Sequence, residues 1–268
     1  MRVILSRKGF DSANGRIVSP IMEDGSLISF PIPSKDQDSF EDLVYGEHTY
    51  SKILSDLNYK GKTNCHVDPD LSVERRKNTI DNWCPIFGQI KSSSVYLMRN
   101  VGVKPGDLFL FFGNYHKVKC VDDKYHYVKK AGDFYSDNDL QIIWGYMQVG
   151  EIVTDPDKQK QYFWHPHSIE NRIKEKTNVM FIARDKLSFN ETMPGAGLLK
   201  FREDRVLTAK GCKKATWVKR SVYDIDSIIG SRKNSSKIPD TIYYAGIWQE
   251  LGLHESTECE EWAKTIIQ

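Results

Sequence analysis

Residues 105–153 read PGDLFLFFGNYHKVKCVDDKYHYVKKAGDFYSDNDLQIIWGYMQVGEIV and carry the strongest β-strand signal of the chain. Leu108–Phe112 and Ile142–Ile152 are apolar runs bounded by turn residues, which predicts two buried strands. The Asp122-Asp123 pair separates two further segments of strand character and indicates a hairpin. Gly145 and Gly150 interrupt the second run, which predicts a bulge or a close backbone approach there.

Outward from this stretch, strand signals dominate and helix signals are short. Arg2–Ser6, Ser26–Ile32 and Asn178–Ala183 have the composition or alternation of strands. Short helices are expected where Ser39 precedes Phe40–Leu43, over Tyr50–Leu57 and over Glu258–Ile267. We therefore predict a β-rich α+β fold over residues 1–268 as a single domain, with a mixed or antiparallel sheet and peripheral helices. Residues 87–190 are compatible with a small barrel of the PUA or EVE type.

Composition and charge exclude several classes of protein. The chain has 268 residues, 40% hydrophobic and 12% aromatic, which rules out a disordered or low-complexity protein. The 38 Lys and Arg against 36 Asp and Glu leave a net charge of +2. A chain whose positive and negative charges are so nearly equal is not a protein that coats duplex nucleic acid mainly through phosphate contacts, because such proteins need a cationic excess on one face. This charge fits a compact, nucleotide-sized site instead.

The apolar runs and the cysteines predict the setting of the protein. No run of 18 apolar residues occurs, so we expect no membrane span and no membrane partner. The five cysteines are scattered and form no Cys-x-x-Cys pair, which argues against a zinc knuckle or a disulfide framework. We therefore expect a reducing, cytoplasmic location.

The first chemical constellation is Ser6-Arg7-Lys8-Gly9-Phe10-Asp11, where a strand runs into a charged loop. Arg7 and Lys8 are suited to phosphate, Gly9 to close backbone approach, and Asp11 to a hydroxyl or a proton. The alternative is a solvated turn with a surface ion pair.

The second constellation is His66-Val67-Asp68-Pro69-Asp70. Alternate residues of an extended segment share one side, so His66, Asp68 and Asp70 would face together. A polar loop beside a pocket is the leading interpretation, and a carboxylate pair sharing a proton is another. His-x-Asp with a distant histidine, His165 or His167, is also the pattern of an iron(II) facial triad. The pattern is short, so we assign no metal ligand and name no cofactor.

A third group of polar residues lies among aromatic ones. His165 and His167 follow Phe163-Trp164 and could bind a planar base or supply a general acid, although core aromatics with loop-capping histidines would give the same pattern. Gln89 and Gln148 have amide groups that can read base edges. Four aromatic side chains could stack on a planar ligand: Phe112, Trp144, Tyr146 and Trp164.

Several segments together resemble one family, the third nucleotide modification associated domain. They lie in order along the chain: Ile4–Asp11, Ser19-Pro20-Ile21 with Asp24-Gly25, His66–Asp70, Phe87-Gly88-Gln89, Gly106–Gly113, Ile143–Ile152, His165-Pro166-His167 and Pro194–Gly197. The resemblance implies a setting of modified DNA bases in phages and bacteria. It implies a nucleotide, or a nucleic acid with modified bases, as partner, but no reaction and no protein partner.

Two functional interpretations follow, with a structural subunit as a third. In the leading one the protein is an enzyme for transfer or hydrolysis at a nucleotide base or its glycosidic bond. Arg7 and Lys8 would bind phosphate and His165 or His167 would assist the acid or base, for which the candidates are Asp11, Asp68, Asp70 and Glu151. In the alternative the same pocket recognises a modified base or small nucleotide without turnover, with Trp144 stacking and Gln89 and Gln148 reading the base.

Overall fold

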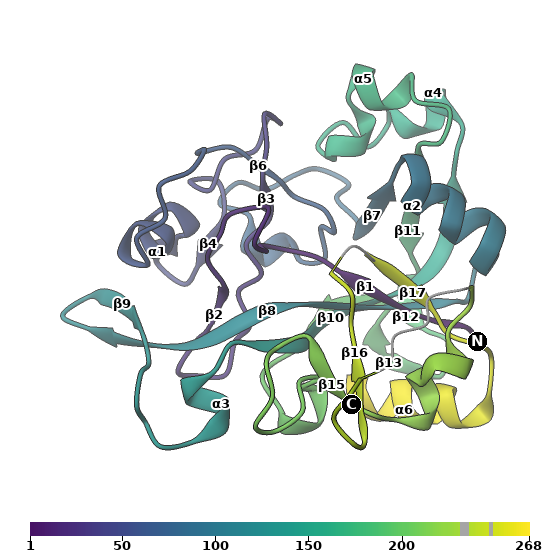
Figure 1. Ribbon diagram of the computed structural model, residues 1–268. Helices are drawn as coiled ribbons and strands as arrows, with labels where there is room; N and C mark the ends of the chain where they lie inside the picture. Colours follow the sequence, from purple (N-terminus) through teal and green to yellow (C-terminus); the bar gives the residue numbers. More distant parts are fainter. Residues whose placement is uncertain (231–235, 247–248) are drawn as a thin grey trace.

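One mixed sheet of nine strands organises the described residues, which are 1–230, 236–246 and 249–268 of a computed structural model (Figure 1). Its path runs through β17 (Glu250–Gly252), β1 (Val3–Arg7), β8 (Leu108–Val121), β10 (Leu140–Val153), β11 (Val179–Ala183) and β7 (Ile86–Gln89), with β14 (Ala196–Leu198) on β10 and with β2 (Ser19–Ile21) and β9 (Lys124–Tyr127) on β8. β8 pairs in parallel with β1 and β2, and the other pairings are antiparallel.

The two apolar runs form the long central strands β8 and β10, as the sequence predicts. Their register runs from Leu140 opposite Tyr115 to Gln148 opposite Leu108, with a shift between Ile143 and Gly145. A second shift, between Val149 and Glu151, lies where β10 pairs with β11. Both predicted bulges are therefore confirmed. The predicted hairpin is also present, because Val121 of β8 faces Lys124 of β9.

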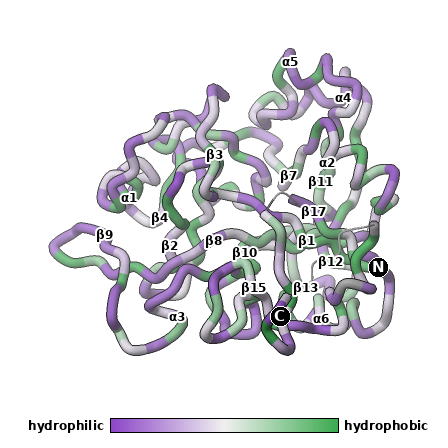
Figure 2. Tube along the Cα trace, in the orientation of Figure 1, coloured by the Kyte–Doolittle hydropathy of each residue, from purple (hydrophilic) through white to green (hydrophobic). Residues whose placement is uncertain are grey.

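Both faces of the central strands are buried, which explains why Leu108–Phe112 is apolar without alternation. Leu108, Leu110 and Phe112 pack on one face with Trp217 and the C-terminal helix α6 (Thr257–Ile267). Phe109 and Phe111 pack on the other face with Phe87 and Phe181. Figure 2 shows hydrophobic residues along these strands and hydrophilic residues on the outlying α4 (Pro156–Gln159) and α5 (Glu170–Ile173).

The sheet does not close into a barrel within the described residues, because its path ends at β17 and at β7 without pairing these two strands. The two ends nevertheless meet through side chains. Gln89 Nε2 of β7 donates to Glu250 Oε1 of β17 at 2.7 Å, and Lys8 Nζ, just after β1, donates to the same oxygen at 3.0 Å. The β-rich α+β class is confirmed, and the barrel compatible with residues 87–190 is replaced by a curled, open sheet.

The remaining elements are short and surround the sheet. Two-stranded pairs join β3 (Ile32–Pro33) to β6 (Cys65–His66), β4 (Val44–Tyr45) to β5 (His48–Thr49), β12 (Lys186–Leu187) to β13 (Asn190–Pro194), and β15 (Thr216–Val218) to β16 (Thr241–Tyr243). The other helices and helical turns are α1 (Tyr50–Asp56), η1 (Val73–Arg75), α2 (Lys91–Val95), η2 (Tyr96–Val101), α3 (Phe134–Asp137), η3 (Pro166–Ser168), η4 (Glu203–Arg205), η5 (Ser221–Tyr223) and η6 (Ile225–Ser227).

The short-helix predictions succeed in two places and fail in one. The helices expected over Tyr50–Leu57 and Glu258–Ile267 are α1 and α6. The helix expected after Ser39 is absent, and a turn stands there. Asp42 Oδ2 accepts from both the backbone N–H and the hydroxyl of Ser39, so the polar side chains that looked like a helix cap close a loop instead. That residues 1–268 form a single domain stays a prediction.

Candidate functional site

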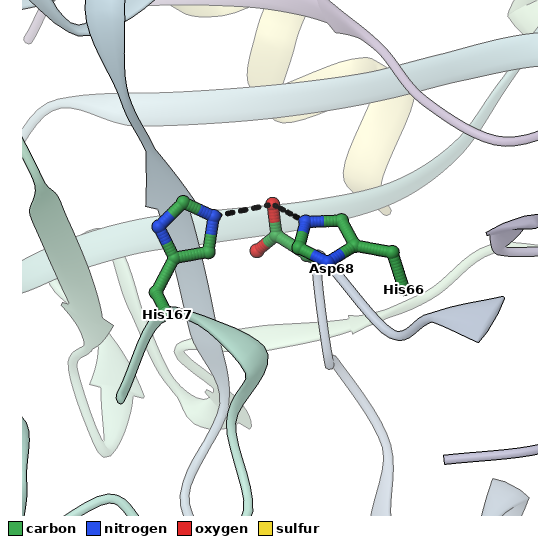
Figure 3. A group of neighbouring side chains, drawn as sticks. All are labelled: His66, Asp68 and His167. Carbon is green, nitrogen blue, oxygen red and sulfur yellow. Dashed lines mark ion pairs between the residues drawn. The ribbon is translucent and has the colours of Figure 1, made fainter. Parts of the chain in front are cut away.

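Three side chains from distant parts of the chain converge on one point (Figure 3). His66 ends β6, Asp68 follows two residues later, and His167 lies in η3. The Nε2 atoms of His66 and His167 each lie 3.8 Å from Asp68 Oδ2. All three ligand atoms lie within 4.8 Å of one another, so this group could hold a metal ion.

The second oxygen of Asp68 is occupied by protein donors. Asp68 Oδ1 accepts from the backbone N–H of Gly88 in β7 at 2.7 Å and lies 3.3 Å from His165 Nε2. Burial alone would raise the pKa of this carboxyl. The close contact with His165, 3.3 Å away, and the electrostatic interactions with the surrounding imidazoles outweigh burial and hold the pKa of Asp68 well below the ordinary range. Asp68 is therefore ionised at neutral pH.

His66 is oriented by a carboxylate on its far side. Its Nδ1 lies 2.8 Å from Asp36 Oδ2, and Arg172 holds Asp36 through contacts of 2.7 and 3.1 Å. Burial opposes ionisation of Asp36, but the hydrogen bonds and charges of His66 and Arg172 keep its pKa below the ordinary range. Asp36 therefore accepts the Nδ1 proton of His66, and the Nε2 atom is left to face Asp68.

His167 is held by a buried amide network. Its Nδ1 lies 2.7 Å from Asn178 Oδ1, while Asn178 Nδ2 donates to Gln159 Oε1 at 2.8 Å. Burial lowers the pKa of His167 to about 3, so the ring is neutral at physiological pH. Gly88 provides the space for this ring, because a Cβ at Gly88 would lie 2.3 Å from His167 Cγ.

A small cavity adjoins this cluster. It measures about 50 Å³, and its lining includes Lys8, Gly9, Asp68, Asp70 and Trp144. That volume is well below the roughly 300–1,000 Å³ of ordinary small-molecule pockets. Lys8 lies 4.3 Å from the centre of the Phe87 ring and contacts Glu250, which also accepts from Gln89.

Of the residues singled out from the sequence, several come together here. Lys8, Asp68, Asp70 and Trp144 line the cavity, His165 and His167 contact Asp68, and Gln89 contacts the Glu250 partner of Lys8. Asp70 Oδ2 is already held by Arg76 at 2.8 Å and by the Trp83 indole at 2.8 Å. Burial raises the pKa of Asp70, and the Arg76 guanidinium opposes that rise.

The others lie in different surroundings. Arg7 and Asp11 form an ion pair of 3.3 Å. Asp11 Oδ1 also accepts from the backbone N–H groups of Ala13 and Asn14 in the turn that follows. Gln148 binds the Gly106 carbonyl and the Ser188 backbone as a buried structural amide. Glu151 is an exposed residue 3.5 Å from Lys158. The aromatic rings of Phe112 and Tyr146 belong to the core beneath α6, and Trp164 packs with Ile86 and Met180.

Four contributors to the site were not singled out from the sequence: Asp36, Gly88, Asn178 and Glu250. Nothing local marks Asp36 or Asn178, because each acts through a residue far away along the chain. Gly88 stood within a resemblance segment, but its steric role depends on where His167 lies.

The fold and the cluster define an α+β protein with a buried carboxylate surrounded by imidazoles. Residues 2–245 match the model of nucleotide modification associated domain 3, so the chain belongs to that family. The resemblance noted in the sequence is thereby confirmed, and the protein is associated with nucleotide modification. No curated protein matches the chain, and no solved structure matches it either. No helix among the described residues is long and apolar enough to cross a membrane.

Proposed function

We propose that this protein is an enzyme acting on a nucleotide base, or on the glycosidic bond of that base, in a nucleotide or a nucleic acid with modified bases. The observation that carries the proposal is the Asp68 carboxyl group, buried among His66, His165 and His167 beside a cavity. A buried ionisable group with a strongly perturbed pKa beside a cavity is a candidate functional group.

The cluster can perform two tasks in such a reaction. An ionised carboxylate stabilises positive charge that develops on a sugar ring as a glycosidic bond breaks. His165 and His167, which contact Asp68, orient that carboxylate, and the low pKa of His167 makes its ring a neutral partner rather than a proton acceptor. Asp68 is thus the carboxylate assigned to the reaction, with the histidines assisting it.

Lys8 and Trp144 would position the substrate. Lys8, already paired with Glu250, brings a cation to the cavity wall for an anionic group, and the largely buried indole of Trp144 lines the same cavity, where the edge of a base could contact it. The cavity of about 50 Å³ is too small to enclose a whole base. We therefore expect the base to lie at the mouth, with its reacting edge directed towards Asp68. The cytoplasm, expected from the scattered cysteines, is where such a substrate would be met.

The test uses mass spectrometry on the full chain. The protein is incubated with nucleotides and oligonucleotides that carry unmodified or chemically modified bases, and released bases or altered nucleotides are identified. We expect a product with the wild type and at least a 100-fold loss of rate with Asp68→Asn. The exposed Glu151→Gln is the matched carboxylate control and should keep the wild-type rate. Equal rates for all three proteins would refute the assignment to Asp68.

A binding module without turnover is the second candidate. The observation in its favour is that Trp144 lines the cavity while its Nε1–H has no hydrogen-bond partner among the described residues. A base edge could accept that proton. If this candidate holds, a nucleotide raises the melting temperature of the wild type and no product forms. A measured product that disappears in Asp68→Asn, with nucleotide affinity retained, excludes it.

A further inference from the structure

We infer that His66 Nε2, Asp68 Oδ2 and His167 Nε2 bind one divalent transition-metal ion. The inference goes beyond the proposed function, because ion binding is measured without any nucleotide and without turnover. It starts from the convergence of the three atoms in Figure 3, where the two imidazoles approach the same carboxylate oxygen from different sides.

The tautomer of His167 is fixed by backbone carbonyls. Gln159 Nε2 donates to the carbonyls of Val153 and Asn178, so its Oε1 is the acceptor for Asn178 Nδ2. Asn178 Nδ2 also donates to the His167 carbonyl, which leaves Asn178 Oδ1 to accept from His167 Nδ1. Nδ1 of His167 therefore carries the proton that Asn178 Oδ1 accepts, and Nε2 is the nitrogen that faces Asp68.

His66 is prepared in the same way by a different partner. Its Nδ1 donates to Asp36 Oδ2 at 2.8 Å, and Arg172 fixes Asp36 from the other side at 2.7 Å. A carboxylate behind a histidine is the common outer partner of a metal-bound imidazole, because it sets the tautomer and increases the basicity of the ligand nitrogen. His66 Nε2 then faces the same carboxylate oxygen as His167 Nε2 does.

Asp68 divides its two oxygens between the protein and this convergence point. Oδ1 accepts from Gly88 N–H, and His165 Nε2 lies beside it at 3.3 Å. His165 Nδ1 accepts the His167 backbone N–H, so its ring proton is on Nε2 and His165 is an outer donor rather than a ligand. Oδ2 faces the two Nε2 atoms at 3.8 Å, a separation too long for a hydrogen bond. Two imidazole nitrogens and one carboxylate oxygen thus face one point, and these are the ligand types that bind a transition-metal ion.

The ligand set selects the kind of ion. Two imidazoles with one carboxylate suit zinc, iron(II) and neighbouring first-row metals, whereas magnesium and calcium prefer all-oxygen sites. Metal–ligand bonds of about 2.0–2.2 Å would bring neighbouring ligand atoms to roughly 3.0–3.5 Å. The two 3.8 Å separations to Asp68 Oδ2 need a contraction of a few tenths of an ångström. The two Nε2 atoms, which lie within 4.8 Å of each other, would also move closer on binding the ion. Three protein ligands would leave coordination positions for water or substrate.

The experiment uses the full chain after removal of bound metal with a chelator. Cobalt(II) is titrated by its visible absorption and zinc by calorimetry, with magnesium as the comparison ion. We expect one cobalt or zinc ion per chain and no saturable magnesium binding. Asp68→Asn and His66→Gln should each weaken zinc binding at least 100-fold, and the outer-partner variant Asp36→Asn by about 10–100-fold.

The matched control is His116→Gln, which alters another imidazole–carboxylate pair, His116 with Asp139, and should bind zinc as the wild type does. Circular dichroism checks that each variant is folded. A second measurement uses the wild type alone, so it does not depend on whether a variant folds. Proton NMR of the cobalt-bound protein should show two shifted, exchangeable N–H signals, one from each imidazole ligand. Absence of stoichiometric binding by the folded wild type, or unchanged affinity in folded Asp68→Asn and His66→Gln, would overturn the inference.

Discussion

At the scale of single residues, His116 on β8 shows what a carboxylate does to an imidazole away from the site. Its Nδ1 lies 2.9 Å from Asp139 Oδ1 and its Nε2 lies 2.8 Å from the Val128 carbonyl. Burial alone would lower the pKa of His116, but these two hydrogen bonds outweigh it and raise the pKa above its ordinary value. The hydrogen bond from His116 lowers the pKa of Asp139 in turn.

These shifts predict a pH window for stability. The raised pKa of His116 contributes stability that is complete below the unfolded value of about 6.5 and is lost as pH rises through the folded pKa. The lowered pKa of Asp139 contributes stability above the unfolded value of about 3.9 and loses it as pH falls through the folded pKa. We therefore expect the pair to stabilise the fold most between about pH 4 and 6.5.

Urea unfolding across this range checks the prediction, with NMR titration of the His116 ring alongside it. His116→Gln should lower the free energy of unfolding at pH 5.5 more than at pH 8.5. A His116 ring that titrates below its ordinary value would contradict the expectation.

Some members of the cluster around Asp68 can be predicted from the sequence, and others cannot. His66-Val67-Asp68 was noted as a possible half of a metal triad, because residues two apart share a side of an extended segment. Asp36 and Asn178 could not be found in the same way. Each meets its histidine through the course of irregular loops, which no periodicity encodes. The sequence therefore predicts His66, Asp68 and a distant histidine, His165 or His167, but not the partners Asp36 and Asn178 that orient the rings.

At the scale of elements, the ends of the curled sheet are joined by Lys8, Gln89 and Glu250. The side chains of Lys8 and Glu250 are 10% and 1% exposed, so the ion pair is shielded from water. Breaking a buried ion pair leaves an uncompensated charge and typically costs about 3–5 kcal/mol. We expect Glu250→Ala to lower the free energy of unfolding by about 3 kcal/mol, measured by urea denaturation.

The exposed Glu255 supplies the comparison for that variant. It lies 4.0 Å from both Arg2 and Lys104, and Glu255→Ala should change stability by less than about 0.5 kcal/mol. Equal effects of the two substitutions would mean that the contact between β7 and β17 contributes nothing beyond a surface charge pair.

Long elements were easier to predict than short ones. β8 and β10 are predictable because a continuous apolar run bounded by turn residues is typical of a buried strand. Ser26–Ile32 alternates like a strand, yet only isolated bridges at Ser26 and Leu27 and the start of β3 at Ile32 pair there. Two-residue strands such as β3 and β6 are too short for any periodicity, so tertiary contacts alone define them.

At the scale of the whole molecule, the chain beyond the family match completes the fold. The match ends at residue 245, whereas β17 and α6 follow it. Leu251, Leu253, Ala263 and Ile266 of this segment are buried in the core that covers one face of the sheet. The segment also provides Glu250 to the site region.

We therefore expect a chain ending at residue 245 to lose cooperative folding. Six of the 22 buried residues of that core lie beyond residue 245. Burial of a large apolar side chain contributes roughly 1.5–3 kcal/mol, so their loss is comparable with the roughly 5–15 kcal/mol by which domains are stable. Thermal melting followed by near-ultraviolet circular dichroism checks this. A chain ending at residue 256 keeps β17 and serves as the intermediate variant. A sharp wild-type-like melt of the shorter chain would show that the matched region folds on its own.

The pairing of β1 with β17 has a consequence for synthesis of the protein. Ile4 lies opposite Gly252, so two strands that share one ladder leave the ribosome at nearly opposite times. At about 5–20 residues per second, β1 waits roughly 12–50 s for its neighbour. During that interval the edge of β1 that later pairs with β17 has no strand beside it, because β8 pairs with the opposite edge, and the nascent chain depends on chaperones to keep the open edge from joining another molecule.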